Sequence, residues 1–149
     1  MNRNSAHIAV RALGLLTIFG LAAVAQAREC TLVGVAGRYG YTSSGTIVNP
    51  AIGAFLAVGR VTFNEDGTLS GAQTTSFGGI MVEETIDATY SVNPDCTGLA
   101  IVHIYHGSTL ARTTNLKIVW DNHEQEARGF FLTPGTAISI LAQKMFGDD

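Results

Sequence analysis

Two long segments of this sequence alternate apolar and polar side chains at every second position. In residues 80–92 one face is apolar except for Glu84, and the opposite face is mainly acidic or hydroxyl-bearing. Residues 109–121 repeat the pattern, with one predicted apolar face that Arg112 and Thr114 interrupt and that otherwise consists of Leu110, Leu116, Ile118 and Trp120. A period of two residues is typical of β-strands that bury one face. The pattern therefore predicts an all-β protein.

Short turns divide the rest of the sequence into further strands. Asp66-Gly67 supplies the positive φ that a tight hairpin turn needs, and Gly78-Gly79, Gly107-Ser108 and Pro134-Gly135 mark similar turns. Residues 51–57 suit either a short helix or an apolar strand. The other predicted strands are residues 37–44, 58–63, 68–77, 80–92, 99–106, 109–121, 127–133 and 136–145.

This order of strands favours a closed barrel. Short connections make strands that follow each other in the sequence antiparallel neighbours. About eight such strands hide their edges most simply by closing into a single up-and-down barrel. A two-sheet sandwich is the alternative, but sandwiches use longer crossovers between sheets. Residues 45–57 are the one candidate for such a crossover.

The first 27 residues have the pattern of a secretory signal peptide. Arg3 and Arg11 supply positive charge before an apolar stretch at residues 12–25, and Ala25 and Ala27 are the small residues that a signal peptidase reads. The apolar core is shorter than the roughly 20 residues that a membrane anchor needs. We therefore expect cleavage before Arg28, a mature β-barrel domain of residues 28–149, and a secreted or periplasmic location.

The mature part contains two cysteines, Cys30 and Cys96. In an oxidising compartment such a pair predicts one disulfide. A reactive thiol pair is the alternative, but such pairs are usually close in sequence, as in Cys-x-x-Cys. A bridge that closes a loop of this length stabilises a domain by about 2–4 kcal/mol.

The charge of the mature chain argues against two classes of partner. Without Arg3 and Arg11 it carries 7 basic and 12 acidic side chains, a net charge of −5, and it has no basic run. Nucleic acids and anionic membrane surfaces both need clustered Lys and Arg. No second apolar segment is long enough to span a bilayer.

Three segments resemble a known group of proteins: residues 37–41, 58–71 and 88–98. In this order they are similar to small secreted bacterial proteins with a calycin-like barrel, related in fold to allene oxide cyclase and its bacterial relatives. The resemblance implies a barrel with an apolar small-molecule cavity and, as an alternative, a cyclase. Allene oxide cyclase uses a barrel-lining glutamate and a bound water around an apolar fatty-acid epoxide. The similar segments do not place that glutamate on one position here.

Glu84 and Arg112 are the charged residues on otherwise apolar strand faces. Burial would raise the pKa of Glu84 and make it a usable acid or base, so it is the catalytic candidate. A rim position or a pairing with a cation is the alternative. Arg112 could pair with Glu84, hold the carboxylate of a ligand or reach water at a barrel mouth. We expect at least one of the two to line the largest pocket, with Tyr90 and Trp120 as apolar walls.

His103 and Tyr105 are further candidates for ligand binding. They share one face of residues 99–106, but both faces of this segment are apolar, so the inner face is left open. His103 and His106 point to opposite sides of a regular strand and cannot share a metal. No metal site or cofactor is predicted, and no Gly-x-Ser-x-Gly elbow supports a hydrolase.

The sequence is compatible with three functions. The first is a secreted barrel that binds an apolar or amphipathic small molecule. The second is a cyclase or isomerase that acts on an apolar substrate inside the barrel. The third is a barrel filled by its own side chains, with a structural or protein-interaction role. The sequence leaves the ligand and the oligomeric state open.

Overall fold

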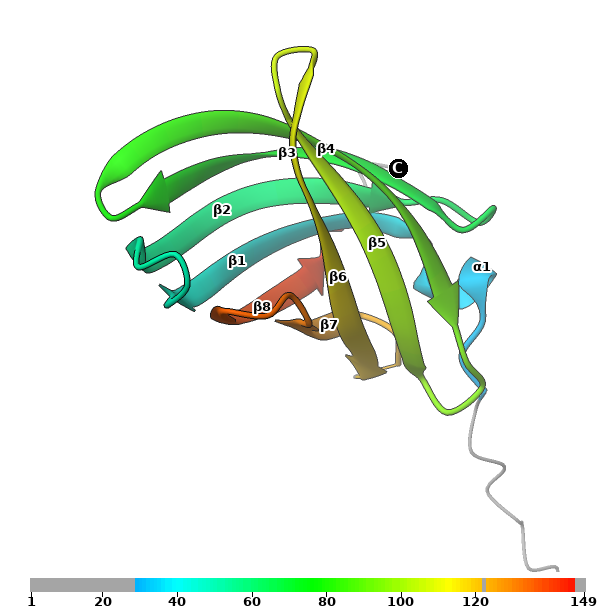
Figure 1. Cartoon of the computed structure of the whole chain (residues 1–149). Helices are drawn as coiled ribbons and strands as arrows, with labels where there is room; N and C mark the ends of the chain where they lie inside the picture. Colours follow the sequence, from blue (N-terminus) through cyan, green and yellow to red (C-terminus); the bar gives the residue numbers. More distant parts are fainter. Residues whose placement is uncertain (1–28, 122, 147–149) are drawn as a thin grey trace, which may run out of the picture.

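The computed structural model describes residues 29–121 and 123–146, which form a closed eight-stranded barrel (Figure 1). Consecutive strands are antiparallel neighbours, and the last strand pairs with the first over nine positions. The predicted signal peptide lies outside the described residues. The elements are α1 (Leu32–Val35), β1 (Gly37–Ile47), β2 (Gly53–Phe63), β3 (Thr68–Phe77), β4 (Ile80–Val92), β5 (Thr97–His106), β6 (Thr109–Asp121), β7 (Glu126–Phe131) and β8 (Thr136–Lys144).

The up-and-down barrel is confirmed, and the sandwich is excluded because the sheet closes on itself. The ambiguous residues 51–57 are neither a helix nor a separate strand, since β2 runs unbroken from Gly53. Phe55 and Ala57 point inward and are buried, whereas Leu56 and Val58 are exposed. This two-residue period continues into the predicted strand 58–63, and it explains why one long strand forms.

Aromatic side chains fill the end of the barrel at which β1 begins. The Phe63 ring lies 5.0 Å from Tyr39, 4.9 Å from Tyr90 and 6.2 Å from Trp120, centroid to centroid. The short helix α1, which the sequence did not predict, lies at this end (Figure 1), with Val35 fully buried. The hydroxyl of Tyr39 donates to the Val35 carbonyl at 2.9 Å. This end is therefore closed by packed side chains.

The predicted disulfide is confirmed. Cys30 and Cys96 are bonded, and their Cα atoms are 4.9 Å apart. The bridge fastens the segment before α1 to the turn between β4 and β5, and the Cys30 amide also donates to the Pro94 carbonyl at 3.3 Å. It therefore holds α1 against the end of the barrel.

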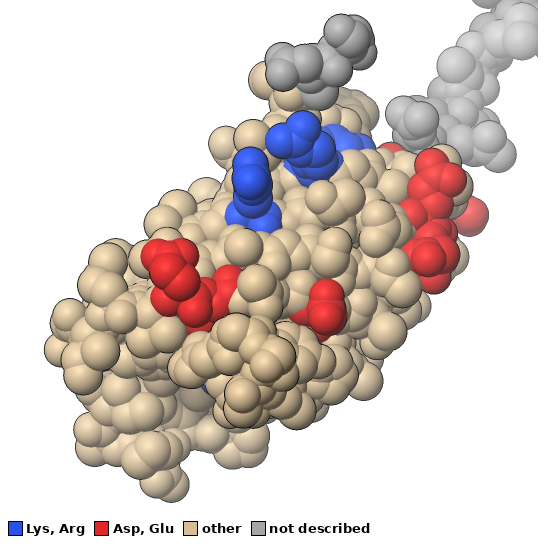
Figure 2. Space-filling model, turned by 90° about the horizontal axis from the view of Figure 1, so that it is seen from above, with Lys and Arg blue, Asp and Glu red and all other residues tan. Residues whose placement is uncertain are grey.

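The outer wall carries few charges. On the face in Figure 2, a few basic side chains lie together in one small group and the acidic ones occupy separate places, so this face has no broad basic surface. None of the helical structure within the described ranges has the length and apolar character needed to cross a membrane.

Candidate functional site: a buried carboxylate network beside an apolar cavity

The strand register places four inward positions in one row across β1 to β4. Tyr41 lies opposite Gly59, Gly59 opposite Gln73, and Gln73 opposite Glu84. The two-residue turn between β3 and β4 fixes the last of these pairs, because Phe77 and Ile80 face each other across it. The row brings a phenol, an amide and a carboxylate together inside the barrel.

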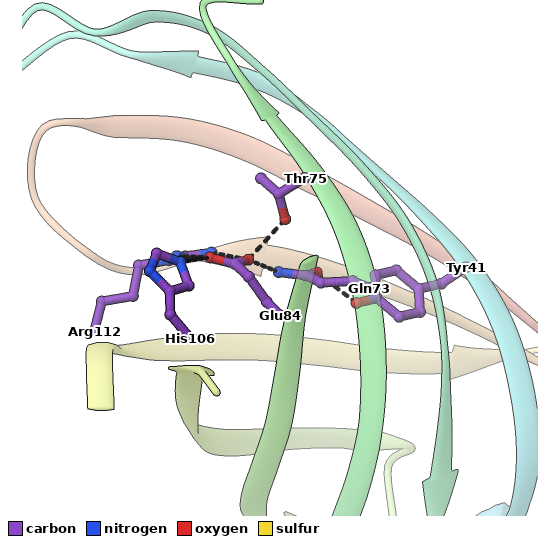
Figure 3. Close-up of polar contacts among 6 residues, drawn as sticks. All are labelled: Tyr41, Gln73, Thr75, Glu84, His106 and Arg112. Atoms are coloured by element: carbon purple, nitrogen blue, oxygen red, sulfur yellow. Dashed lines mark hydrogen bonds and ion pairs between the residues drawn. The ribbon is translucent and has the colours of Figure 1, made fainter. Parts of the chain in front are cut away.

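Gly59 has a specific steric role in this row. A Cβ atom at this position would lie 2.9 Å from the Tyr41 hydroxyl and 2.5 Å from the Ala72 carbonyl oxygen. Without a side chain on β2, the Tyr41 hydroxyl crosses that strand and donates to Gln73 Oε1 at 2.6 Å (Figure 3). Glycine is therefore required here for space rather than for backbone conformation.

Glu84 is the centre of the network, and its side chain is fully buried. Both oxygens of the carboxylate accept hydrogen bonds, as Figure 3 shows. Oε2 accepts from Gln73 Nε2 at 2.6 Å, from Thr75 Oγ1 at 2.7 Å and from Arg112 Nη2 at 2.8 Å; Oε1 accepts from His106 Nε2 at 2.8 Å and from Arg112 Nη1. The charge is thus paired bidentately and its remaining lone pairs are satisfied.

A β-bulge sets the position of Arg112. Ile104 lies opposite Arg112 and Tyr105 opposite Leu110, so Ala111 is an extra residue without a partner in β5. Arg112 therefore points inward beside Ile104, while Leu110 is exposed on the outer wall with Tyr105. The prediction that Leu110 shares the face of Arg112 is wrong, because the bulge inverts the alternation between them.

The guanidinium of Arg112 is held on two sides. It pairs with Glu84, and its Cζ atom lies 5.0 Å from the centre of the Phe77 ring. The Arg112 side chain is 29 % exposed and that of His106 is 48 % exposed. These two cationic or titratable groups form the solvent-facing side of the network, whereas Glu84, Gln73 and Tyr41 form its buried side.

The expected direction of the Glu84 pKa is wrong. Burial does raise the pKa of this carboxyl, but the hydrogen bonds from Arg112, Thr75, Gln73 and His106 together outweigh burial and lower the pKa to about 2. Glu84 is therefore an ionised carboxylate at neutral pH and not a general acid. Its catalytic role stays a prediction, restricted to what a permanently charged group can do.

The Tyr41 hydroxyl is held in its protonated form. Burial, followed by the negative charge of Glu84, raises the pKa of Tyr41 well above its ordinary value, and Arg112 opposes the shift. The hydroxyl therefore keeps the proton that it donates to Gln73.

An apolar cavity of about 70 Å³ lies inside the barrel next to this network. Every strand contributes to its wall. Tyr41 and Gln73 belong to both the network and the cavity wall. Small side chains leave the space open, among them Ala100, Ala127, Gly129 and Ala142.

The polar residues in the wall turn almost no polar surface toward the cavity, because their polar atoms already have partners. The Tyr41 hydroxyl bonds to Gln73, the Ser43 hydroxyl donates to the Ser139 carbonyl at 3.1 Å, and the Thr114 and Thr133 hydroxyls are 2.7 Å apart. The surface that the cavity offers is thus almost entirely apolar.

The structure brings Glu84 and Arg112 together, as one of the three alternatives for Arg112 predicted. The expectation that Glu84 or Arg112 lines the largest pocket is wrong, because neither residue belongs to the wall of this cavity or of two pockets on the outer surface, and their charges are satisfied within the network. Tyr90 and Trp120 are not walls of this cavity either. Their rings pack on Phe63 and fill the end of the barrel near α1.

The open question about residues 99–106 is settled by burial. Ala100, Val102 and Ile104 are buried inside the barrel, so the candidate residues His103 and Tyr105 lie on the outer wall. His103 Nδ1 lies 3.0 Å from Thr113 Oγ1 there. In the described part of the chain, no three His, Cys, Asp or Glu side chains gather as metal ligands.

Four members of the network were missed from the sequence: Tyr41, Gln73, Thr75 and His106. A signal for Gln73 was present, because a two-residue turn at Gly78-Gly79 fixes its pairing with Glu84. Thr75 lies two residues along the same strand and on the same face. His106 required the register of β4 and β5, where Thr85 lies opposite Tyr105 and so places Glu84 beside His106.

No protein-family model matches the sequence, and searches among curated proteins and solved structures gave no match. The resemblance to the allene oxide cyclase barrels therefore stays a prediction. The structure shows the fold class, a closed antiparallel β-barrel, and does not assign the chain to a family.

Proposed function

We propose that this protein is a secreted small-molecule-binding barrel that takes a small apolar molecule, or the apolar part of an amphipathic one, into its interior cavity. The observation that carries the proposal is the apolar cavity lined by residues of all eight strands. Apolar cavities of this kind are poor sites for water, because a buried water needs polar partners. An apolar ligand would gain the dispersion contacts that the empty space lacks.

The carboxylate network supports this proposal by keeping polar groups out of the cavity. Gln73 uses its amide nitrogen on Glu84 and its oxygen on Tyr41, so neither end of the amide seeks a partner in the cavity. Arg112 and His106 lie on the exposed side of the network. For an amphipathic ligand, we propose that an acidic head group contacts Arg112, whose guanidinium can bind a carboxylate.

A filled barrel with a structural or protein-interaction role is the second candidate. The observation that favours it is the size of the cavity, about 70 Å³, because most ligand pockets measure roughly 300–1,000 Å³. The cyclase or isomerase alternative draws less support. A free, buried carboxyl would favour it, whereas Glu84 is ion-paired and its pKa is lowered.

Native mass spectrometry tests the proposal. Protein purified under mild conditions from the compartment to which it is exported should carry a bound mass that denaturation releases. The same chain, unfolded and refolded in clean buffer, is the control and should show the bare mass. A bare mass in both samples, with no uptake when apolar compounds are added, would favour the filled barrel.

A further inference from the structure

Gly129 occupies an unusual place in the cavity wall. It lies on β7 between two isoleucines of the neighbouring strands, opposite Ile118 on one side and Ile140 on the other. Ala127 and Phe131, two residues away on either side, also line the cavity, so the three positions share the inward face. Gly129 is thus the point in this row at which no side chain enters the barrel.

Other inward glycines are required by the fold, and Gly129 is not. A Cβ at Gly71 or Gly98 would clash with a backbone carbonyl oxygen, as at Gly59. A Cβ at Gly129 would meet only ordinary contacts: the Lys117 carbonyl oxygen at 3.5 Å and Ile140 side-chain atoms at 3.6 and 3.8 Å. The φ of Gly129 is not positive, so an L-residue can adopt its conformation.

A glycine inside a strand weakens it, because glycine loses more conformational freedom on folding and has no side chain to pack. At Gly129 neither the backbone conformation nor steric crowding requires a glycine, so neither explains why the strand carries this cost. What the missing side chain leaves behind is space in the cavity. Gly129 therefore adds to the volume of the cavity and does not add to the stability of the strand.

We infer that Gly129 holds the cavity open and determines the size of the ligand group that enters it; this inference rests on the binding function proposed above. An apolar cavity of about 150 Å³ accommodates benzene. At about 70 Å³, this one suits a compact hydrocarbon group of about three carbon atoms on the same scale. The group carries no polar atom, because the wall offers it no free hydrogen-bond partner.

Xenon NMR on the folded mature chain tests the inference, since xenon enters apolar cavities without polar contacts. The variants are Gly129→Ala and Gly129→Val. Gly40→Ala and Gly40→Val are the matched controls. Gly40 is also a strand glycine without positive φ, but it lies between the inward Tyr39 and Tyr41, and its Cβ would meet only Met145 atoms at 3.8 and 3.9 Å.

Wild type and both Gly40 variants should bind xenon alike. Gly129→Ala should bind several-fold more weakly, and Gly129→Val should lose at least tenfold in affinity, while both remain at least as resistant to denaturant as the Gly40 variants. Equal xenon affinity in wild type and Gly129→Val would overturn the inference and leave the proposed function standing. The inference would also be overturned if both Gly129 variants unfolded more readily than the Gly40 variants, because the added side chains would then find no free space inside the barrel. Failure of wild type to take up xenon would count against the proposed function itself.

Discussion

Replacing Arg112 by methionine should remove much of the stability that the Glu84 network contributes. The pKa of Glu84 falls from 4.5 to about 2 on folding, which corresponds to about 3 kcal/mol at neutral pH. Arg112 supplies two of the hydrogen bonds to this carboxylate, but Gln73, Thr75 and His106 would remain. Because the guanidinium is partly exposed, we expect a loss of about 2–3 kcal/mol rather than the full cost of breaking a buried pair.

The lowered pKa of Glu84 also determines how the free energy of unfolding changes with pH. A carboxyl with a lowered pKa in the folded state contributes stability above its unfolded pKa of 4.5, and this contribution is lost as the pH falls toward about 2. Wild type should therefore lose stability over this window. In Arg112→Met the pKa of Glu84 rises, so the free energy of unfolding should be lower at pH 7 and should change less between about pH 5 and pH 2.

Chemical denaturation at a series of pH values measures both quantities. Lys117→Met is the matched control, because Lys117 lies on the outer wall of the same strand and its replacement should change stability by less than about 0.5 kcal/mol. Equal losses for the two variants, with the wild-type pH dependence kept in Arg112→Met, would refute the proposed role of the ion pair.

Three further predictions concern the disulfide and the tyrosines. Cys30→Ala should lower the free energy of unfolding of the oxidised protein by about 2–4 kcal/mol and change that of the reduced protein little, which denaturation with and without reductant can compare. Tyr41→Phe leaves Gln73 Oε1 without its hydroxyl partner and should cost about 1–3 kcal/mol, whereas Tyr105→Phe on the outer wall should cost less; equal costs in denaturation curves would argue against the Tyr41–Gln73 bond. Burial, with Asp66 and Glu65 nearby, raises the pKa of Tyr90 to about 12, and burial also raises the pKa of Tyr39 and Tyr41. Because these raised pKa values belong to the folded state, the free energy of unfolding should fall as the pH rises past 10, the pKa of tyrosine in the unfolded chain. An ultraviolet titration should show three of the four tyrosines ionising only above about pH 11 or on unfolding.

The strands could be predicted from the sequence because their pattern is local. The limits of β4 and β6 follow from alternation and from the glycine turns at Gly78-Gly79 and Gly107-Ser108. Closure into a barrel followed from the short connections. The disulfide followed from the number of cysteines in an expected export context.

The interior was harder to predict because it depends on register and packing. Glu84 and Arg112 were identified as inward charges, but the pKa of Glu84 also depends on three further residues. The register of β3 with β4 brings Gln73 and Thr75 to the carboxylate, and the register of β4 with β5 brings His106. The bulge at Ala111 leaves no clear sign in the sequence, and it reverses the face of Leu110.

The sequence did not show which face of β5 points into the barrel, because Leu99 and Ile101 are apolar although they lie half-exposed on the outer wall. The cavity also lay beyond the sequence pattern. It arises because small residues from several strands line the same space, which the pattern of no single strand reveals.

A crystal structure of the mature chain under xenon pressure tests the central claim most directly. The account predicts xenon density inside the barrel, beside Gly129, Ile118 and Phe131, with the Glu84 network unchanged. Density confined to the outer wall, or an interior closed by side chains with no xenon, would contradict it.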